Sequence, residues 1–154
     1  MNLPPDVIDL LREFAAADVR YLLIGGHAVG FHAEPRFTKD IDLWIEDSPA
    51  NVASSQNALR RFGAPKTTID ALVSANGLDV VWMGQPPLRI DLMKQVPGGD
   101  FAQAYAARVA QDLDGVALSV IGRADLIALK RASGRPQDLA DIASLERLTT
   151  AVQP

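Results

Sequence analysis

Two aspartates, Asp40 and Asp42, alternate with hydrophobic residues in the segment 40–46, DIDLWIE. Strict alternation predicts a β-strand, in which successive side chains point to opposite faces. The isoleucines and the leucine would then form the core face, and the two carboxylates would project from the other face together with Trp44. Their α-carbons would be roughly 6.5–7 Å apart, a separation at which carboxylates repel unless a cation lies between them. The pair therefore indicates a site for Mg²⁺ or Mn²⁺, although the same alternation is typical of any half-exposed strand.

A third aspartate, Asp91, stands in the hydrophobic segment 88–93, LRIDLM. Because an unpaired buried charge is costly, this carboxylate needs a partner. Either Arg89 or a more distant arginine neutralises it, or it meets Asp40 and Asp42 across the sheet. Three convergent carboxylates would suit two metal ions about 3.5–4 Å apart, which hold the attacking and leaving oxygens of a phosphoryl transfer.

A glycine pair, Gly25 and Gly26, follows the short hydrophobic segment 21–24 and precedes the segment 27–32, for which we expect one or two helical turns. Glycine lets backbone amides approach a phosphate closely, and the first N–H groups of a helix are free to bind anions. A tight turn is the alternative interpretation. The pair belongs neither to a Rossmann fingerprint nor to a Walker loop, since the sequence contains no G-K-[ST].

Several cationic residues occur near these segments and are candidate phosphate contacts, because a guanidinium group can bind a phosphate through two hydrogen bonds. They are Arg36, Lys39, Arg89, Lys130, Arg131 and Arg135. For any one of them, a solvated surface position is an equally good explanation.

Hydrophobic periodicity predicts helices and strands that mix along the chain. We expect helices at 5–18, 27–32, 51–62, 67–75, 101–111, 124–131 and 137–148, and strands at 21–24, 40–46, 78–83, 88–93 and 116–121. Ser48 is expected to cap the helix at 51–62, and the Gly-Gln-Pro-Pro segment 84–87 predicts a hairpin. No internal repeat or linker is visible, so we predict one α/β or α+β domain over residues 1–154, with the helices at 124–149 packed as part of it.

Composition narrows the possible chemistry. The chain has 154 residues, a net charge of −4 and no cysteine, which excludes disulfides, thiolate zinc sites and cysteine nucleophiles. His27 and His32 are the only histidines, too few for a zinc site without cysteine. There is no signal-peptide pattern and no long apolar segment, so we expect a cytoplasmic protein without a membrane span.

Taken together, these motifs resemble the nucleotidyltransferase superfamily typified by DNA polymerase β, and in particular its small prokaryotic members of the minimal and abortive-infection types. The superfamily pattern is a Gly-Gly or Gly-Ser pair, an Asp-hydrophobe-Asp strand and a later aspartate, here Gly25-Gly26, Asp40-Ile41-Asp42 and Asp91. The segment 129–142, LKRASGRPQDLADI, resembles the lysine helix and the Asp-Leu-x-Asp helix of these small members. Many active members carry serine where this chain has Gly26, so the hydroxyl that contacts the terminal phosphates is missing here.

The resemblance implies a mixed sheet of roughly four or five strands flanked by helices. It also implies transfer of a nucleoside monophosphate from a nucleoside triphosphate to an acceptor, with release of pyrophosphate. Asp40, Asp42 and Asp91 would be the metal ligands and catalytic residues. The nucleotide or its phosphates would contact Gly25, Gly26, Arg36, Thr38, Lys39 and Lys130, with Thr38 also holding the loop before the strand. We expect Asp138 and Asp141 to be structural.

Small members of this superfamily often occur in toxin–antitoxin pairs, so the resemblance also implies a possible partner toxin or antitoxin. The acceptor is left open between a protein, an RNA and a small molecule, and a homo-oligomer is an option. The alternatives to an active transferase are a degenerate nucleotide-binding or regulatory protein and a phosphohydrolase that uses the same aspartates.

Overall fold

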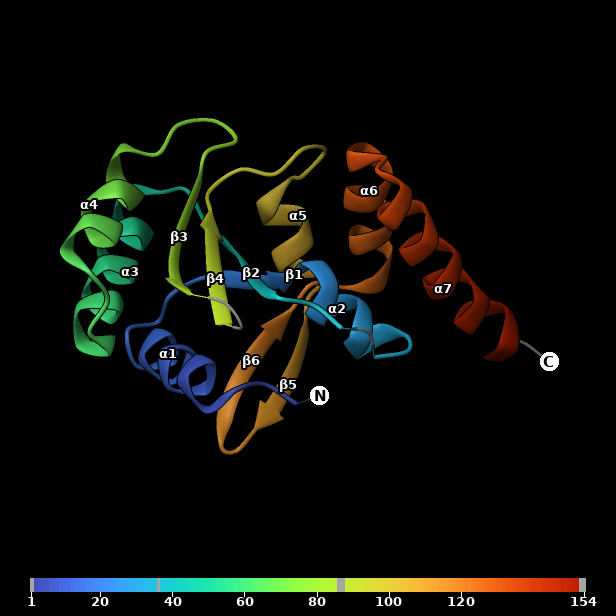
Figure 1. The fold of residues 1–154 in the computed structure, drawn as a ribbon, viewed down its shortest axis with the longest axis horizontal. Coiled ribbons are helices and arrows are strands. Elements are labelled where there is room, and N and C mark those ends of the chain that lie inside the picture. Colours follow the sequence, from blue (N-terminus) through green and yellow to red (C-terminus); the bar gives the residue numbers. More distant parts are fainter. Residues whose placement is uncertain (1, 36, 86–87, 153–154) are drawn as a thin grey trace.

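A mixed sheet of six strands is the centre of the molecule, with the strand order β3-β4-β2-β1-β6-β5 (Figure 1). The computed structural model describes residues 2–35, 37–85 and 88–152, without the side chains of 148–152. The strands are β1 (Tyr21–Ile24), β2 (Asp40–Ile45), β3 (Val80–Gln85), β4 (Leu88–Met93), β5 (Val109–Leu113) and β6 (Val116–Val120). The pairings of β2 with β4 and of β1 with β6 are parallel, and the other three, including the central pairing of β1 with β2, are antiparallel.

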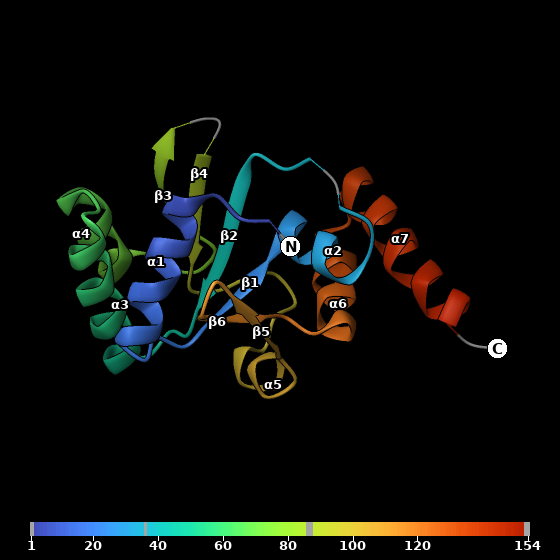
Figure 2. The same ribbon diagram turned by 90° about the horizontal axis from the view of Figure 1, so that it is seen from below.

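The helices occur close to where periodicity predicts them. They are α1 (Pro5–Ala16), α2 (Gly25–His32), α3 (Pro49–Phe62), α4 (Lys66–Ser74), α5 (Phe101–Ala106), α6 (Arg123–Ser133) and α7 (Pro136–Val152). Figures 1 and 2 show α1, α3 and α4 grouped at one side of the sheet, and α2, α6 and α7 grouped at the other. The predicted cap of α3 is confirmed, because the Ser48 side chain accepts a hydrogen bond from the Asn51 amide. Among the described residues, none of these helices combines the length and hydrophobicity needed to cross a membrane.

The sixth strand corrects the prediction of a single helix over 101–111. Helix α5 ends at Ala106, and the chain then forms β5, which pairs with β6. Asp114 and Gly115 connect the two strands with φ values of 52° and 81°. Two consecutive residues with positive φ are typical of a type I′ hairpin turn, for which Asp-Gly is a preferred sequence. The dipeptide was therefore the signal for this hairpin.

Trp44 also departs from the simple alternation of β2. It shares a face with the aspartates, yet only 2% of its surface is exposed. Phe101 of α5 packs edge-on against the Trp44 ring, with 5.2 Å between the ring centroids. The Trp44 Nε1 donates a hydrogen bond to the Lys94 carbonyl at 3.2 Å. The face that carries the aspartates is thus covered at one end of β2 and open at the other.

Buried Asn51 ties the start of β1 to the end of β2. Its Oδ1 accepts a hydrogen bond from the Arg20 amide at 2.8 Å. Its Nδ2 donates to the carbonyls of Arg20 at 3.0 Å and Glu46 at 2.9 Å. One side chain thereby binds three backbone groups. The two carbonyls also accept hydrogen bonds from the amides of Glu46 and Ser48, so the Arg20 amide is the group that depends most on Asn51.

We expect Asn51→Leu to lower the free energy of unfolding by about 2–4 kcal/mol, because a side chain of similar size removes three hydrogen bonds and leaves the Arg20 amide without its Asn51 acceptor. Asn57→Leu, on the exposed side of the same helix, is the matched control and should change stability by less than about 0.5 kcal/mol. Urea denaturation of both variants measures the difference. Equal stabilities would contradict this role of Asn51.

Candidate active site

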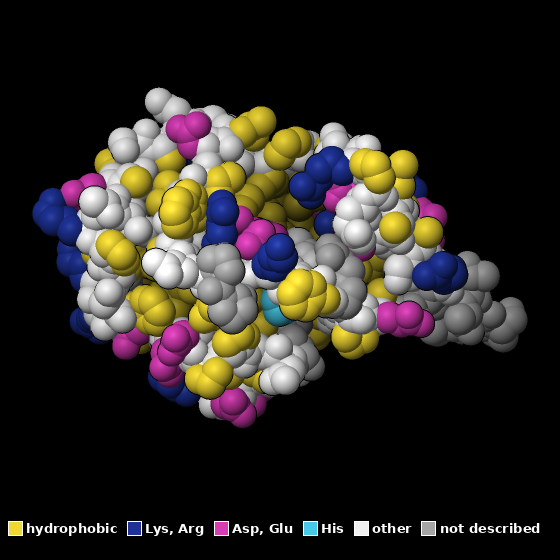
Figure 3. Space-filling model, in the orientation of Figure 1, with side chains coloured by type: hydrophobic (Ala, Val, Ile, Leu, Met, Phe, Trp, Pro, Cys, Tyr) yellow, Lys and Arg dark blue, Asp and Glu magenta, His cyan; other side chains and the backbone are white. Residues whose placement is uncertain are grey.

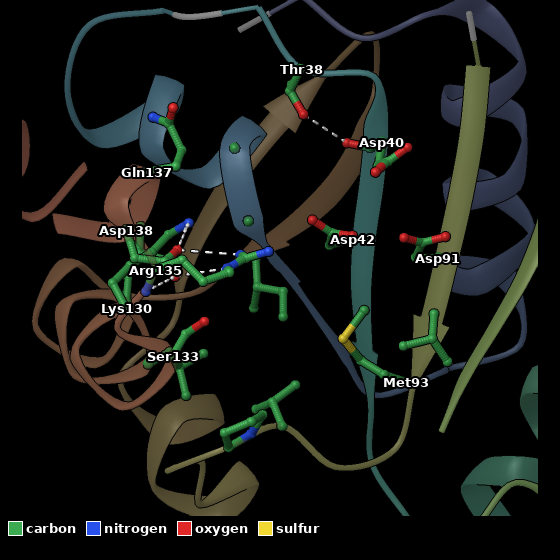
Figure 4. Close-up of a pocket in the computed structure, with 18 of the residues that line it drawn as sticks. Thr38, Asp40, Asp42, Asp91, Met93, Lys130, Ser133, Arg135, Gln137 and Asp138 are labelled. Atoms are coloured by element: carbon green, nitrogen blue, oxygen red, sulfur yellow. Dashed lines mark hydrogen bonds and ion pairs between the residues drawn. The ribbon is translucent and has the colours of Figure 1, made fainter. Parts of the chain in front are cut away.

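Asp42 and Asp91 stand beside each other on neighbouring parallel strands. The register of β2 and β4 pairs Asp40 with Arg89 and Asp42 with Asp91. In-register residues on adjacent strands point to the same face, and Figure 4 shows Asp42 and Asp91 side by side on β2 and β4, with Asp40 further along β2. All three aspartates line one cavity. The structure therefore brings together Asp40, Asp42 and Asp91, the three carboxylates that the sequence predicts to form one site.

Asp91 satisfies both alternatives that the sequence left open. Its Oδ1 accepts a hydrogen bond from Nε of Arg89 at 2.8 Å, so the neighbouring arginine is indeed a partner. The same carboxylate also faces Asp42 across the strand pair. The side chain of Asp91 is 12% exposed, and that of Arg89 is 39% exposed. Arg89 thus balances part of the charge of the acidic cluster from its solvent side.

Asp42 is the carboxyl group most strongly affected by this arrangement. Burial, followed by the negative charges of Asp91 and Asp40, raises its pKa from 3.8 to about 7, and a hydrogen bond with Asp91 acts in the same direction. The ammonium of Lys130 only partly opposes these effects. Because neighbouring negative charges and burial disfavour the ionised form of Asp42, a cation bound beside it would be stabilised by the same carboxylates.

Gly25 lets α2 begin directly against this cluster. It has a φ of +71°, which L-residues with side chains rarely adopt, and a Cβ at this position would overlap the Asp42 carboxylate. Gly25 and Gly26 also line the cavity. Because they form the first positions of α2, their backbone amides belong to the helix end that attracts anions. The predicted glycine pair therefore has a second function, which is to allow this close approach.

The opposite wall of the cavity is formed by α6 and α7. Lys130 is 7% exposed, and its Nζ forms ion pairs with Asp138 at 3.3 Å and Asp141 at 3.0 Å. Nε of Arg135 binds the other oxygen of Asp138 at 2.9 Å, while the Arg135 side chain remains 72% exposed. Burial would raise the pKa of Asp138, but hydrogen bonds from Arg135, Ser133 and Lys130 outweigh it and hold the pKa well below its usual range. Asp138 is therefore an ionised anchor between a buried lysine and an exposed arginine.

The cavity enclosed by these elements has a volume of about 620 Å³, which is within the usual range for small-ligand sites. Carboxylates lie on its sheet side, and Arg135 and Lys130 lie on its α6–α7 side. Between them are the start of α2 and an apolar strip that includes Val96 and Leu126. This combination suits a ligand that carries both negative charge and apolar surface.

The comparisons with known proteins agree with this geometry. Residues 6–151 match the model of the family described as "Nucleotidyltransferase of unknown function (DUF6036)". The chain belongs to this family. The predicted nucleotidyltransferase assignment is thereby confirmed.

Two solved structures show the fold of this DUF6036 chain. An antigenic nucleotidyltransferase-like protein from Paracoccidioides brasiliensis is 17% identical, with a TM-score of 0.57 over 95% of this chain and 78% of that one. ANT(2")-Ia, solved in complex with adenylyl-2"-tobramycin, is 13% identical, with a TM-score of 0.57 over 95% of this chain and 87% of that one. Among curated proteins, none matches the sequence. The predicted α/β fold of the nucleotidyltransferase type is confirmed, with one or two strands more than expected.

The remaining predicted contacts occupy different positions. Thr38 lines the cavity, and its hydroxyl donates to the Asp40 carbonyl at 3.2 Å, which fastens the loop before β2. Lys39 is exposed and is not among the residues that line the cavity. Arg36 lies outside the described residues. Lys130 lines the cavity, but its ammonium is already bound to two aspartates.

Arg135 lines the cavity, although it is not among the contacts that the family resemblance implies. It was one of several arginines near the motifs, and no property of the single residue set it apart. The available signal was its spacing of three residues before Asp138 at the start of a helix, where a carboxylate can hold a guanidinium. Figure 4 shows its side chain extending from the connection between α6 and α7 toward the sheet.

The donor set fits a hard divalent cation bound jointly by protein and ligand. Carboxylate oxygens are the ligands that Mg²⁺ and Mn²⁺ prefer, and a bound cation would offset the burial and the mutual repulsion that raise the pKa of Asp42. Within the part of the chain that the structure describes, no three His, Cys, Asp or Glu side chains form a ready-made metal cage. Mg²⁺ is commonly held by one or two carboxylates together with substrate phosphates, which is consistent with this finding.

We expect Asp42→Asn to stabilise the metal-free protein, by an amount that increases with pH. The folded protein holds the Asp42 proton up to about pH 7, whereas the unfolded chain releases it near 3.8, so wild-type stability falls as the pH rises through this interval. The shift sets an upper limit of about 4 kcal/mol on the advantage of the variant above that pKa.

Urea denaturation in the presence of a chelator, from about pH 4 to about pH 8, measures this effect. Asp70→Asn is the matched control, because its carboxylate is 58% exposed on α4. An Asp42→Asn protein with the same pH dependence as wild type would contradict the burial and charge repulsion inferred for Asp42.

Proposed function

We propose that this protein is a metal-dependent nucleotidyltransferase, which moves a nucleoside monophosphate from a nucleoside triphosphate to a hydroxyl group of an acceptor. The observation that carries the proposal is the in-register pair of Asp42 and Asp91 directly beside the glycine start of α2. Carboxylates for a metal and free amides for a phosphate then lie at one point of the cavity. Membership of a nucleotidyltransferase family supports the same conclusion.

In this proposal Asp40 and Asp42 hold the divalent cation, which when bound supplies positive charge to the triphosphate and to the developing charge of the transition state. Gly25 and Gly26 present backbone amides to phosphate oxygens at the start of α2. Asp91 orients the acceptor hydroxyl and takes its proton. The acceptor oxygen forms a bond to the α-phosphorus, the bond from that phosphorus to the bridging oxygen breaks, and pyrophosphate leaves with that oxygen.

Arg135 is the residue we assign to the charge of the triphosphate on the α6–α7 side. Its guanidinium is exposed to the cavity, while Asp138 fixes its position. Lys130 then acts as a positioning residue, because its ammonium is buried between Asp138 and Asp141. This assignment differs from the direct phosphate contact of Lys130 that the family resemblance implies.

This proposal leaves the acceptor class open between a protein, an RNA and a small molecule. ANT(2")-Ia, one of the two structural neighbours, was solved with adenylyl-2"-tobramycin, a small molecule that carries a nucleotidyl group. This supports an acceptor site in a fold of this kind, without selecting the acceptor class for this chain.

We expect Asp42→Asn to lower Mg²⁺-dependent transfer from α-labelled ATP by at least about 100-fold while leaving the fold intact, because a neutral amide is a poor metal ligand. Transfer of label is measured with separate acceptor pools of RNA, protein and aminoglycosides, and circular dichroism monitors folding. Asp70→Asn should retain wild-type transfer.

Full activity of Asp42→Asn would refute the assignment of the metal site. Nucleotide binding by wild type in calorimetry, without transfer to any pool, would favour the degenerate nucleotide-binding alternative. Release of free nucleoside monophosphate without a labelled acceptor would indicate a phosphohydrolase.

We expect Arg135→Gln to weaken binding of ATP with Mg²⁺ by about 10- to 150-fold, the usual effect of losing a charged hydrogen bond. Arg131→Gln is the matched control, because Arg131 is a similarly exposed arginine in the last turn of α6 that binds Glu146 and is not among the residues that line the cavity. Isothermal titration calorimetry measures both affinities. If Arg135→Gln binds ATP as tightly as Arg131→Gln does, Arg135 is not a phosphate contact.

A further inference from the structure

Strand β3 has an unusual apolar surface on the face that carries the aspartates. Val80 and Trp82 lie on this face and are 45% and 56% exposed, whereas Val81 and Met83 lie on the other face and are buried. Leu78, just before the strand, is 60% exposed. An exposed strand face normally carries polar side chains, so a contiguous apolar patch here indicates a contact with another molecule.

This patch, which we call the β3 patch and which consists of Leu78, Val80 and Trp82, is continuous with the candidate active site. The register of β3 and β4 places Trp82 beside Asp91, and Val80 is one of the residues that line the cavity. Figure 3 shows hydrophobic side chains over β3 and β4 next to acidic and basic groups at the centre of the face. The patch lies on the far side of Asp91 from α2, α6 and α7, where we place the triphosphate.

Arg89 links the β3 patch to the acidic cluster. Its guanidinium lies over the Trp82 ring at 5.0 Å and also binds Asp91 at 2.8 Å. Lys39 is next to it, since the Arg89 amide donates to the Lys39 carbonyl at 3.4 Å, and the Lys39 side chain is exposed. Trp82, Asp91 and Arg89 thus lie together on β3 and β4, and Lys39 immediately precedes β2.

We propose that the β3 patch and Arg89 form the acceptor subsite, and that the acceptor hydroxyl belongs to a terminal nucleoside; this proposal rests on the proposed function. The base would stack on Trp82, as bases stack on exposed aromatic side chains in single-strand-binding proteins. A sugar hydroxyl would then reach Asp91 one strand away, about 4.8 Å from Trp82. Arg89 and Lys39 suit the phosphate that joins this nucleoside to the rest of a nucleotide or RNA.

A tyrosine acceptor fits this arrangement less well, because its hydroxyl is attached to the stacked ring itself and not to a neighbouring group. In the step we propose, the sugar oxygen forms the bond to the α-phosphorus of the donor, its proton passes to Asp91, and pyrophosphate leaves. No further reactant is required.

Tryptophan fluorescence tests the stacking directly. The chain has two tryptophans, of which Trp44 is buried and Trp82 is exposed, so a stacked base should quench the Trp82 emission selectively. The protein is first saturated with Mg²⁺ and a non-hydrolysable ATP analogue. It is then titrated with adenosine monophosphate, with a short RNA that ends in a free sugar hydroxyl, and with a tyrosine-containing peptide.

The expected result is quenching by the nucleotide, the RNA or both, and its loss in Trp82→Leu. Quenching by RNA alone identifies an RNA end as the source of the nucleoside, and quenching by the monophosphate alone identifies a free nucleotide. Quenching by the peptide alone, quenching by the ATP analogue alone, or no quenching by any probe would overturn the proposal. A wild-type protein that fails to bind the ATP analogue in calorimetry would instead contradict the proposed function, and the RNA and monophosphate titrations would still test the β3 patch.

Kinetics with the quenching probe as acceptor separates stacking from general hydrophobic contact. Trp82→Leu should raise KM for the acceptor by about 5- to 150-fold, and Trp82→Phe should restore most of the loss because it keeps an aromatic face. Binding of the ATP analogue should be the same in both variants. Leu139→Ala, at a 59% exposed position on α7, is the control for loss of an exposed apolar side chain. An unchanged acceptor KM in Trp82→Leu would overturn the proposal.

Discussion

The approach of Asp42 to Asp91 is the interaction on which the site depends. Two carboxylates in register on parallel strands repel each other, and burial adds to the cost of their charge, as the raised pKa of Asp42 records. Neighbouring elements reduce this cost from separate directions. Gly25 admits the start of α2 against Asp42, Arg89 binds Asp91 from its own strand, and Lys130 contributes positive charge from across the cavity. A divalent cation held by the aspartates would complete the compensation.

Buried charge is also compensated in the helix pair α6–α7, where oppositely charged side chains form ion pairs. Lys130, Asp138 and Asp141 are all buried, so each charge requires a partner, and the ion pairs between them provide it. Asp138 has a second oxygen available, and this oxygen holds Arg135 at the cavity surface. The buried ion pairs fix the position of Asp138, and Asp138 in turn fixes the orientation of the exposed Arg135 guanidinium. Such an orientation is what a site for a multiply charged ligand requires.

The candidate site has two sides with different chemistry, one on each side of strand β2. On the side of α2, α6 and α7, backbone amides and Arg135 suit phosphate groups. On the side of β3 and β4, Trp82 and Arg89 present an aromatic ring and a cation. Strand β2 lies between them and carries Asp40 and Asp42. Lys130 and Arg135 line the cavity of this acidic protein, and Arg89 binds Asp91 on the other side of β2, so positive charge lies on both sides of the aspartates.

The sequence alone determined the local elements of this protein and the identity of its acidic cluster. Alternation in 40–46 and 88–93 is a local property of the chain, so it specified which residues share a face before any contact was known. The Asp114-Gly115 turn carried an equally local signal, for the strand that the prediction missed. Only the tertiary structure decided that Asp91 lies beside Asp42, that Lys130 is enclosed by aspartates while Arg135 faces the cavity, and that Trp82 adjoins Asp91. These facts depend on strand order and helix packing, which arise from contacts between residues far apart in the chain, and no spacing within a segment encodes them.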